Sequence, residues 1–243
     1  MRDTGLTGRV ALLTGASGGI GMALGRRLIA AGVSTAFAYA THADEAGTLV
    51  NEAKEAGLNA IAVAADLTDP AAPAALADTV VRALGPIDVL IPNAGLGETC
   101  HYAEVDLAMW DRSIAVNLRA PFLLAQAVLP GMIERGFGRV LFTSSLAAFT
   151  GGVVGPHYAA AKAGLHGLAH HLAARVAAAG VTVNVLAPAL IEDTRMLPSA
   201  DRGLLPVGRF GRPEEVADLA MAMLGNGYLT SQVIGLDGGA YPR

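Results

Sequence analysis

Short apolar runs alternate with longer helical patterns along the whole chain, and this alternation restricts the fold more than any other feature of the sequence. The runs that read as strands lie at residues 10–14, 34–39, 60–64, 87–91, 139–144, 181–186 and 232–236. Because nearly all of their residues are apolar, both faces of the sheet are expected to be covered, which is typical of parallel strands. The pattern predicts an α/β protein: a doubly wound, seven-stranded parallel sheet with helices on both faces.

The segments between the strands have helical patterns, at residues 19–31, 43–56, 70–84, 107–134, 157–179 and 213–224. We expect the long 107–134 helix to bend near Pro121 and Pro130, because proline removes a helical hydrogen bond. No internal repeat, low-complexity tract or linker interrupts the series, and 243 residues is a normal length for one α/β domain. Residues 1–243 are therefore expected to form a single domain.

Composition argues against several classes of protein. Hydrophobic residues make up 53% of the chain and charged residues 16%, which argues against disorder. The net charge is −4 and Lys and Arg form no run, so neither nucleic acid nor a membrane is an expected partner. Cys100 is the single cysteine, and the N-terminal residues lack the apolar region of a signal peptide. We expect a cytoplasmic protein without a transmembrane helix.

A glycine-rich turn, LLTGASGGIGMALGRRL, joins the first expected strand to the first expected helix. Gly15, Gly19 and Gly21 fit three needs of a dinucleotide site: a tight turn, close approach of a pyrophosphate, and close packing of helix on strand. The start of the helix would then present free N–H groups to the anion. The alternative is a tight turn that binds nothing. In this context the pattern favours a Rossmann-type dinucleotide site.

The residues after the second strand bear on which dinucleotide is bound. NAD sites often carry an acidic residue there, which holds the ribose 2′-OH. This chain reads AFAYATHADE, with Tyr39 at the expected acidic position and the first carboxylate, Asp44, only at the start of the next helix. Thr41 and His42 are able to donate hydrogen bonds to a 2′-phosphate, although His42 is equally well read as a solvated loop residue. NADP(H) is therefore favoured over NAD(H).

The stretch HYAAAK places Tyr158 and Lys162 four residues apart among alanines. Alanine favours helix, and positions four apart share one helix face. The two side chains are then either a packed surface pair or a proton donor beside a cation. A cation within ~4–6 Å lowers a tyrosine pKa from about 10 by about 1–3 units, closer to neutral pH. The second reading predicts acid–base chemistry.

TGASGGIG, Asn93-Ala94-Gly95 and YAAAK stand in this order, and Ser145 precedes Tyr158 by 13 residues. With GRFGRPEEVA and GLDGG toward the end, the sequence resembles the short-chain dehydrogenase/reductase family over nearly its whole length. Within that family it looks most like the 3-oxoacyl-acyl-carrier-protein reductases. The resemblance implies an oxidoreductase that transfers a hydride between a nicotinamide cofactor and a carbonyl or alcohol carbon.

The resemblance also implies catalytic roles. Tyr158 would be the general acid of ketone reduction, Lys162 would lower its pKa and hold the nicotinamide ribose, and Ser145 would bind the substrate oxygen. Asn117 would support a water chain that resupplies the proton. The cofactor contacts implied are Gly15, Ser17, Gly19, Ile20, Gly21, Thr41, Asp66, Leu67, Asn93, Ala94, Gly95, Tyr158, Lys162, Pro188, Ala189, Ile191 and Thr194. No metal is expected.

Some positions depart from the family pattern. Pro92 stands where an asparagine is common, and proline there is expected to mark the end of the strand. Ala189 replaces the usual glycine after Pro188, which would narrow the nicotinamide pocket. The lid segment 189–210 is shorter than is usual in the acyl-carrier reductases.

Together these features predict NADPH-dependent reduction of a ketone, either a β-ketoacyl thioester, free or carrier-bound, or another small carbonyl compound. The resemblance implies a homotetramer or homodimer. Two alternatives remain open: an NAD-dependent secondary-alcohol dehydrogenase, and a nucleotide-binding protein that does not catalyse a reaction.

Overall fold

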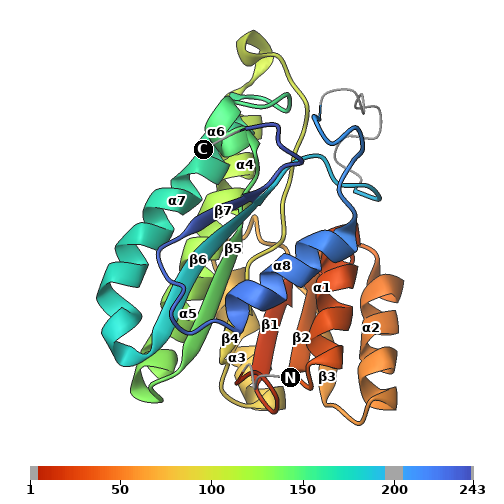
Figure 1. Cartoon of the computed structure of the whole chain (residues 1–243), viewed down its shortest axis with the longest axis vertical. Coiled ribbons are helices and arrows are strands. Elements are labelled where there is room, and N and C mark those ends of the chain that lie inside the picture. The colour runs from red at the N-terminus through yellow and green to blue at the C-terminus, as the bar shows by residue number, and fades with distance from the viewer. Residues whose placement is uncertain (1–4, 195–204, 242–243) are drawn as a thin grey trace.

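The computed structural model describes residues 5–194 and 205–241, and its strands form one parallel sheet (Figure 1). The seven strands run in the order β3-β2-β1-β4-β5-β6-β7. Their bounds are β1 Val10–Thr14, β2 Ser34–Tyr39, β3 Ala60–Ala64, β4 Val89–Ile91, β5 Gly138–Thr143, β6 Val181–Pro188 and β7 Val233–Leu236. The doubly wound parallel sheet predicted from the sequence is confirmed.

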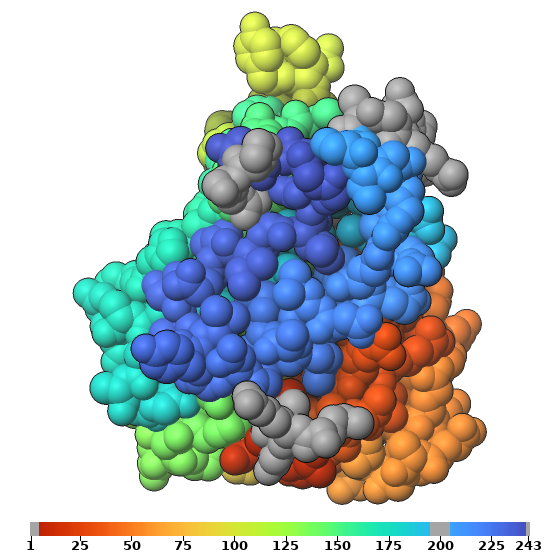
Figure 2. All heavy atoms as spheres, viewed as in Figure 1, coloured from red at the N-terminus to blue at the C-terminus, as the bar shows by residue number. Residues whose placement is uncertain are grey.

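Helices cover both faces of the sheet and enclose two hydrophobic cores. On one face lie α1 (Gly19–Ala30), α2 (Ala43–Glu55) and α8 (Pro213–Leu224); on the other lie α3 (Ala72–Leu84), α5 (Ala120–Glu134) and α7 (Pro156–Val176). Residues after 205, blue in Figure 2, form most of the face seen there, and α1 and α2 lie beside them in red and orange. The strands are buried between the helix layers, which explains their continuous apolar runs.

The strand order places a topological switch point at β1. Leu12 of β1 pairs with Ala36 of β2 on one side and with Leu90 of β4 on the other. The chain leaves β1 toward β2 and β3 and then crosses back to β4, so the loops that follow β1 and β4 diverge. In open parallel sheets this divergence creates the crevice in which ligands bind.

The long helical region agrees with its prediction at one of the two prolines. It consists of α4 (Leu107–Ile114), a π-helical turn η2 (Ala115–Arg119) and α5, so it is interrupted directly before Pro121. A proline removes the helical hydrogen bond to the carbonyl four residues earlier, which is that of Asn117 in η2. Pro130 lies inside α5. Short elements that the periodicity did not predict are α6 (Ala147–Thr150), η1 (Tyr102–Glu104) and η3 (Ala177–Ala179).

Residues Leu107–Glu134 are also long and apolar enough to cross a membrane by length and composition. In their most apolar window, 44% of the residues are buried inside the protein. Leu124, Val128 and Met132 of α5 belong to the core that packs against the sheet. Packing against the sheet is therefore a sufficient explanation for the high hydropathy of this stretch.

Two helix glycines make opposite predictions for stability. A Cβ on Gly25 of α1 would lie 2.7 Å from Cδ1 of Leu49 and 3.1 Å from Cε1 of Phe37, both fully buried. A Cβ on Gly47 of α2 would meet nothing within 4 Å. Thermal or urea unfolding should show Gly25→Ala losing about 1–3 kcal/mol through overpacking, whereas Gly47→Ala should gain about 0.5–1 kcal/mol because alanine is the better helix former. Equal effects would mean that α1 and α2 do not pack as described.

Candidate active site

A cavity of about 770 Å³ lies at the carboxyl edge of the sheet, within the range of about 300–1,000 Å³ that is typical of cofactor and small-molecule sites. Residues that follow each of the seven strands line it. The residues predicted from the sequence that contribute to its wall are Gly15, Ser17, Gly19, Ile20, Gly21, Thr41, Asp66, Leu67, Asn93, Ala94, Gly95, Ser145, Tyr158, Lys162, Pro188, Ala189, Ile191 and Thr194. Asn117 does not line it.

The glycine loop forms a cradle that has no room for side chains. Gly15 has a positive φ of 65°, and a Cβ there would lie 2.7 Å from Cα of Ala94. A Cβ on Gly21 would collide with the carbonyl oxygen of Gly15, and one on Gly19 would press on the carbonyl of Asp193. Gly18, the N-cap of α1, offers no side chain to cap the helix. A helix start of this kind fits the pyrophosphate of a dinucleotide.

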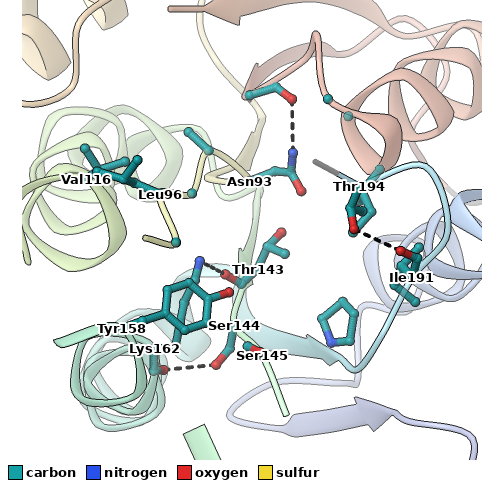
Figure 3. A pocket seen from close by; sticks show the side chains of 18 of the residues that line it. Asn93, Leu96, Val116, Thr143, Ser144, Ser145, Tyr158, Lys162, Ile191 and Thr194 are labelled. Atoms are coloured by element: carbon teal, nitrogen blue, oxygen red, sulfur yellow. Dashed lines mark hydrogen bonds between the residues drawn. The ribbon is translucent and has the colours of Figure 1, made fainter. Parts of the chain in front are cut away.

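Thr14 and Asn93 hold the two diverging loops together. The hydroxyl of Thr14 accepts hydrogen bonds from the backbone N–H of Asn93 and of Ala94, both at 3.1 Å. The Asn93 amide donates to the carbonyls of Thr14 and Gly15 at 3.3 Å (Figure 3). Thr14 was missed by the sequence analysis. The sequence feature that could have identified Thr14 is its position: it is a hydroxyl residue at the end of the central strand, directly before the glycine loop.

The adenosine of a dinucleotide would lie at the end of the cavity that the loops after β2 and β3 form. Tyr39, Ala40 and Thr41 line it, and none of these three carries a carboxylate. Thr41 is fixed at both ends: its carbonyl accepts from Ser17 Oγ at 3.0 Å, and its hydroxyl lies 2.7 Å from Nδ1 of His42. His42 itself does not line the cavity.

Asp66 supplies the negative charge at this end. It accepts hydrogen bonds from the backbone N–H and the hydroxyl of Thr68, at 2.9 and 2.7 Å. These bonds lower the pKa of the Asp66 carboxyl, with the hydroxyl making the larger contribution. The carboxylate is therefore held in one orientation at the cavity wall.

Tyr158 and Lys162 of α7 point into the other end of the cavity (Figure 3). Both are almost fully buried, with 5% and 3% of their surface exposed. The Lys162 ammonium donates to the carbonyl of Thr143 at 2.8 Å and lies 5.7 Å from the centre of the Tyr158 ring. The side chains of Ser145 and Tyr158 are hydrogen-bonded to each other. The structure thus brings Ser145, Tyr158 and Lys162 together.

Burial dominates the electrostatics of this group. It lowers the pKa of Lys162 to about 8, because the charged ammonium is removed from water. It also raises the pKa of Tyr158, and the hydrogen bond from Ser145 offsets this only in part. The pKa of Tyr158 is therefore raised rather than lowered, because its loss of hydration exceeds the effect of the Ser145 hydrogen bond. That Lys162 lowers this pKa stays a prediction.

The two adjacent serines have different partners. Ser144 Oγ is 3.0 Å from the carbonyl oxygen of Lys162 and 2.9 Å from Nε2 of His166, so it ties β5 to α7. Ser145 is left to face Tyr158, as the spacing predicted. No group of three or more His, Cys, Asp or Glu side chains suited to a metal occurs among residues 5–194 and 205–241.

Asn117 lies in the π-helical turn and is fully buried. Its amide donates to the carbonyls of Leu96 and Ser113 at 2.8 and 3.0 Å, and its oxygen accepts from the N–H of Leu96 at 3.1 Å. The side chain therefore fixes the loop after β4 instead of facing the cavity.

The substrate end of the cavity is apolar. Leu96, Leu146, Val153, Val154, Leu205 and Phe210 line it beyond Ser145. Val154 also packs against Tyr158.

Part of the predicted lid, residues 195–204, lies outside the described residues. Pro92 directly follows the last residue of β4, as expected.

Comparisons with known proteins agree with this geometry. The short chain dehydrogenase family model matches residues 9–204. The 3-oxoacyl-[acyl-carrier-protein] reductase FabG of Salmonella typhimurium is 35% identical, over 96% of this chain and 98% of its own. Nodulation protein G of Azospirillum brasilense is 34% identical, over 95% and 97%.

Solved structures agree as well. A blue fluorescent protein from a metagenomic library, in complex with NADPH, is 35% identical with a TM-score of 0.91, over 98% of this chain and 99% of its own. A short-chain dehydrogenase/reductase from Serratia marcescens is 33% identical with a TM-score of 0.90, over 97% and 98%. The chain therefore belongs to the short-chain dehydrogenase/reductase family, and it is an NAD(P)-dependent oxidoreductase that acts on CH–OH groups.

Proposed function

We propose that this enzyme reduces a ketone to a secondary alcohol with NADPH, and that Tyr158 donates the proton. The observation that carries the proposal is the buried pair Tyr158 and Lys162, with the half-buried Ser145 beside it, at one end of a cavity whose other end suits a dinucleotide. Perturbed titratable residues in a cleft are typical of catalytic sites.

The state of Tyr158 suits the direction of reduction. When bound, the nicotinamide supplies the hydride for the carbonyl carbon. The Tyr158 phenol is protonated at neutral pH, and burial raises its pKa further above that range. It is able to give this proton to the developing alkoxide, because an alkoxide is a stronger base than a phenolate. Ser145 donates to the same oxygen from the other side, and the apolar surroundings strengthen both hydrogen bonds.

Lys162 supplies the positive charge. Its ammonium would hold the ribose hydroxyls of the nicotinamide half and stabilise negative charge on Tyr158 after the proton has left. Asn117 is proposed to support proton resupply through Lys162. Its side chain is bonded to Leu96 and Ser113, so its backbone is the part left for this role.

The proposed preference for NADPH rests on the end of β2. Tyr39, Ala40 and Thr41 put no carboxylate where a 2′-phosphate would lie. One structural relative was solved in complex with NADPH. No arginine stands at position 18, so Thr41, which lines the cavity, is the proposed donor to the phosphate, and His42 contacts the Thr41 hydroxyl from outside the cavity.

The proposed substrate is a neutral ketone, with β-ketoacyl thioesters, free or carrier-bound, as the first candidates. Several relatives are named 3-oxoacyl-[acyl-carrier-protein] reductases. The described wall near Ser145 is mostly apolar, which suits an acyl chain. We further propose a cytoplasmic homotetramer or homodimer, because Leu107, Trp110 and Phe122 expose 80%, 37% and 39% of their surfaces. Analytical ultracentrifugation would show a monomer if that proposal is wrong.

A panel of ketones and β-ketoacyl thioesters with NADPH tests the reaction. NADPH absorbance should fall with at least one substrate, and Tyr158→Phe should reduce kcat by at least about 100-fold, because the proton donor is lost. Affinity for NADPH, measured by fluorescence, should be retained in the variant. Preference for NADH and an alcohol would instead support a dehydrogenase, and no turnover with any pair would support a non-catalytic protein.

The burial of Lys162 predicts a pH-dependent stability. At pH 7 the lysine is charged in both the folded and the unfolded state, and the shift of its pKa from 10.5 to about 8 costs roughly 3 kcal/mol. The folded protein loses this proton first as the pH rises. The cost is therefore fully present below about pH 8 and disappears toward pH 10.5.

Urea unfolding of the wild type and Lys162→Met across this pH range measures the effect. The wild type should gain up to roughly 3 kcal/mol relative to the variant as the pH rises from about 8 to 10.5. Lys54→Met is the matched control, because Lys54 is the only other lysine and is exposed. A constant difference for Lys162→Met would show that this lysine is not buried in its charged form.

The cofactor preference is tested at Ala40, which lines the adenosine end and is exposed. Ala40→Asp should weaken NADPH binding about tenfold or more by repulsion of the 2′-phosphate, while NADH binding stays the same or improves. Ala40→Asn has the same shape without the charge and should change neither affinity much. If Ala40→Asp leaves NADPH binding intact, the 2′-phosphate does not lie at the end of β2.

A further inference from the structure

His157 is a buried residue beside the catalytic tyrosine to which the proposed reaction gives no role. It is the second residue of α7, directly before Tyr158, and only 1% of its surface is exposed. Helix starts that adjoin surface loops are ordinarily solvated, so the burial of a polar ring at this position needs an explanation.

Hydrogen bonding orients the His157 ring. Nε2 lies 3.1 Å from the carbonyl oxygen of Glu98. A carbonyl can only accept, so Nε2 carries the hydrogen and donates it. Nδ1 is buried and has no hydrogen-bond partner among the described residues. The ring therefore makes one directed bond, to the loop after β4.

The ring fits where it does because residue 155 is glycine. Gly155 has a φ of 149°, and a Cβ there would lie 2.6 Å from Cε1 of His157. The same Cβ would lie 3.0 Å from the carbonyl oxygen of Cys100. The imidazole thus fills the space between the start of α7 and the loop that runs from residue 96 to residue 100.

A second bond joins the same two segments. The N–H of Cys100 donates to the carbonyl of Val154 at 2.9 Å. The Glu98 carboxylate pairs with Arg112 of α4 at 3.0 Å, which holds the outer side of the loop. The chain around η1, yellow in Figure 2, projects from the molecule at this point.

Both joined segments line the substrate end of the cavity. Leu96 and Gly97 line it from one segment, and Val153 and Val154 from the other. Val154 packs against Tyr158. A shift of one segment relative to the other would therefore alter how a ketone is held against the proton donor, while the glycine loop and Asp66 lie at the far end of the cavity.

We propose that His157 is a positioning residue that clamps residues 96–100 to the start of α7 and so sets the width of the substrate site. This inference rests on the proposed ketone reduction and adds a determinant of substrate affinity to it. His157 does not touch the reacting atoms. Its loss weakens binding of the ketone and leaves proton donation and the cofactor in place.

Three variants test the clamp. His157→Leu removes the donor at similar volume, His157→Gln keeps an amide donor near the position of Nε2, and His171→Leu makes the same change at an exposed histidine of the same helix. With NADPH and acetoacetyl-coenzyme A as the probe, His157→Leu should raise KM about tenfold, the loss expected for a directed hydrogen bond to a buried carbonyl. Its kcat should stay within about twofold, and NADPH affinity should not change.

His157→Gln should restore KM to within about threefold of the wild type. His171→Leu should match the wild type. The proposal is wrong if His157→Leu behaves like the wild type. It is also wrong if kcat, KM, NADPH affinity and melting temperature all deteriorate together in both His157 variants, because that pattern indicates a general role in folding.

Amide hydrogen exchange measures how firmly residues 96–100 are held, and it does not depend on catalytic turnover. Residues 96–100 should exchange faster in His157→Leu than in the wild type, whereas His157→Gln and His171→Leu should exchange as the wild type does. If the wild type does not reduce acetoacetyl-coenzyme A, the proposed substrate fails but the exchange result still decides the clamp. Unchanged exchange in His157→Leu overturns it.

Discussion

The site is organised around an ammonium group that has been taken out of water. Lys162 is nearly fully buried, and its described hydrogen bond goes to a neutral carbonyl, that of Thr143, rather than to a carboxylate. Such an arrangement is unfavourable for stability, since the pKa of the lysine falls to about 8. It persists because the rest of α7 is packed on the sheet, so that the folding energy of the core holds the charge beside Tyr158.

At the cofactor end, the shape of the site depends mainly on positions that lack a side chain. Gly15 and Gly21 leave space that a methyl group would fill, and Thr14 and Asn93 fasten the loops on either side of the switch point. The backbone then presents its own polar groups to a ligand. Both ends of the cavity thus depend on the sheet order, which brings the carboxyl ends of distant strands to one edge.

Much of the fold was predictable because its signals are local. Apolar runs marked the strands, and the bounds of β1, β2, β3 and α8 agree with those expected from the sequence. The interruption of the long helix was predicted near Pro121 and Pro130, and it lies at Ala115–Arg119, directly before Pro121, while Pro130 lies inside α5. The sequence did not predict that the interruption is a π-turn, in which the buried side chain of Asn117 contacts Leu96 and Ser113.

By itself the sequence determined the fold class, the glycine turn and the shared helix face of Tyr158 and Lys162, because these depend on spacing along helices and strands; the place of Ser145 beside them was implied by the family resemblance. Only the tertiary structure decided the balance of electrostatics, since burial raises the pKa of Tyr158 and lowers that of Lys162. It also decided the partners of Asn117 and His157, whose bonds reach loops that are 21 and 59 residues away in the sequence. Hydration and long-range contacts depend on where the whole chain folds, and no local pattern records them.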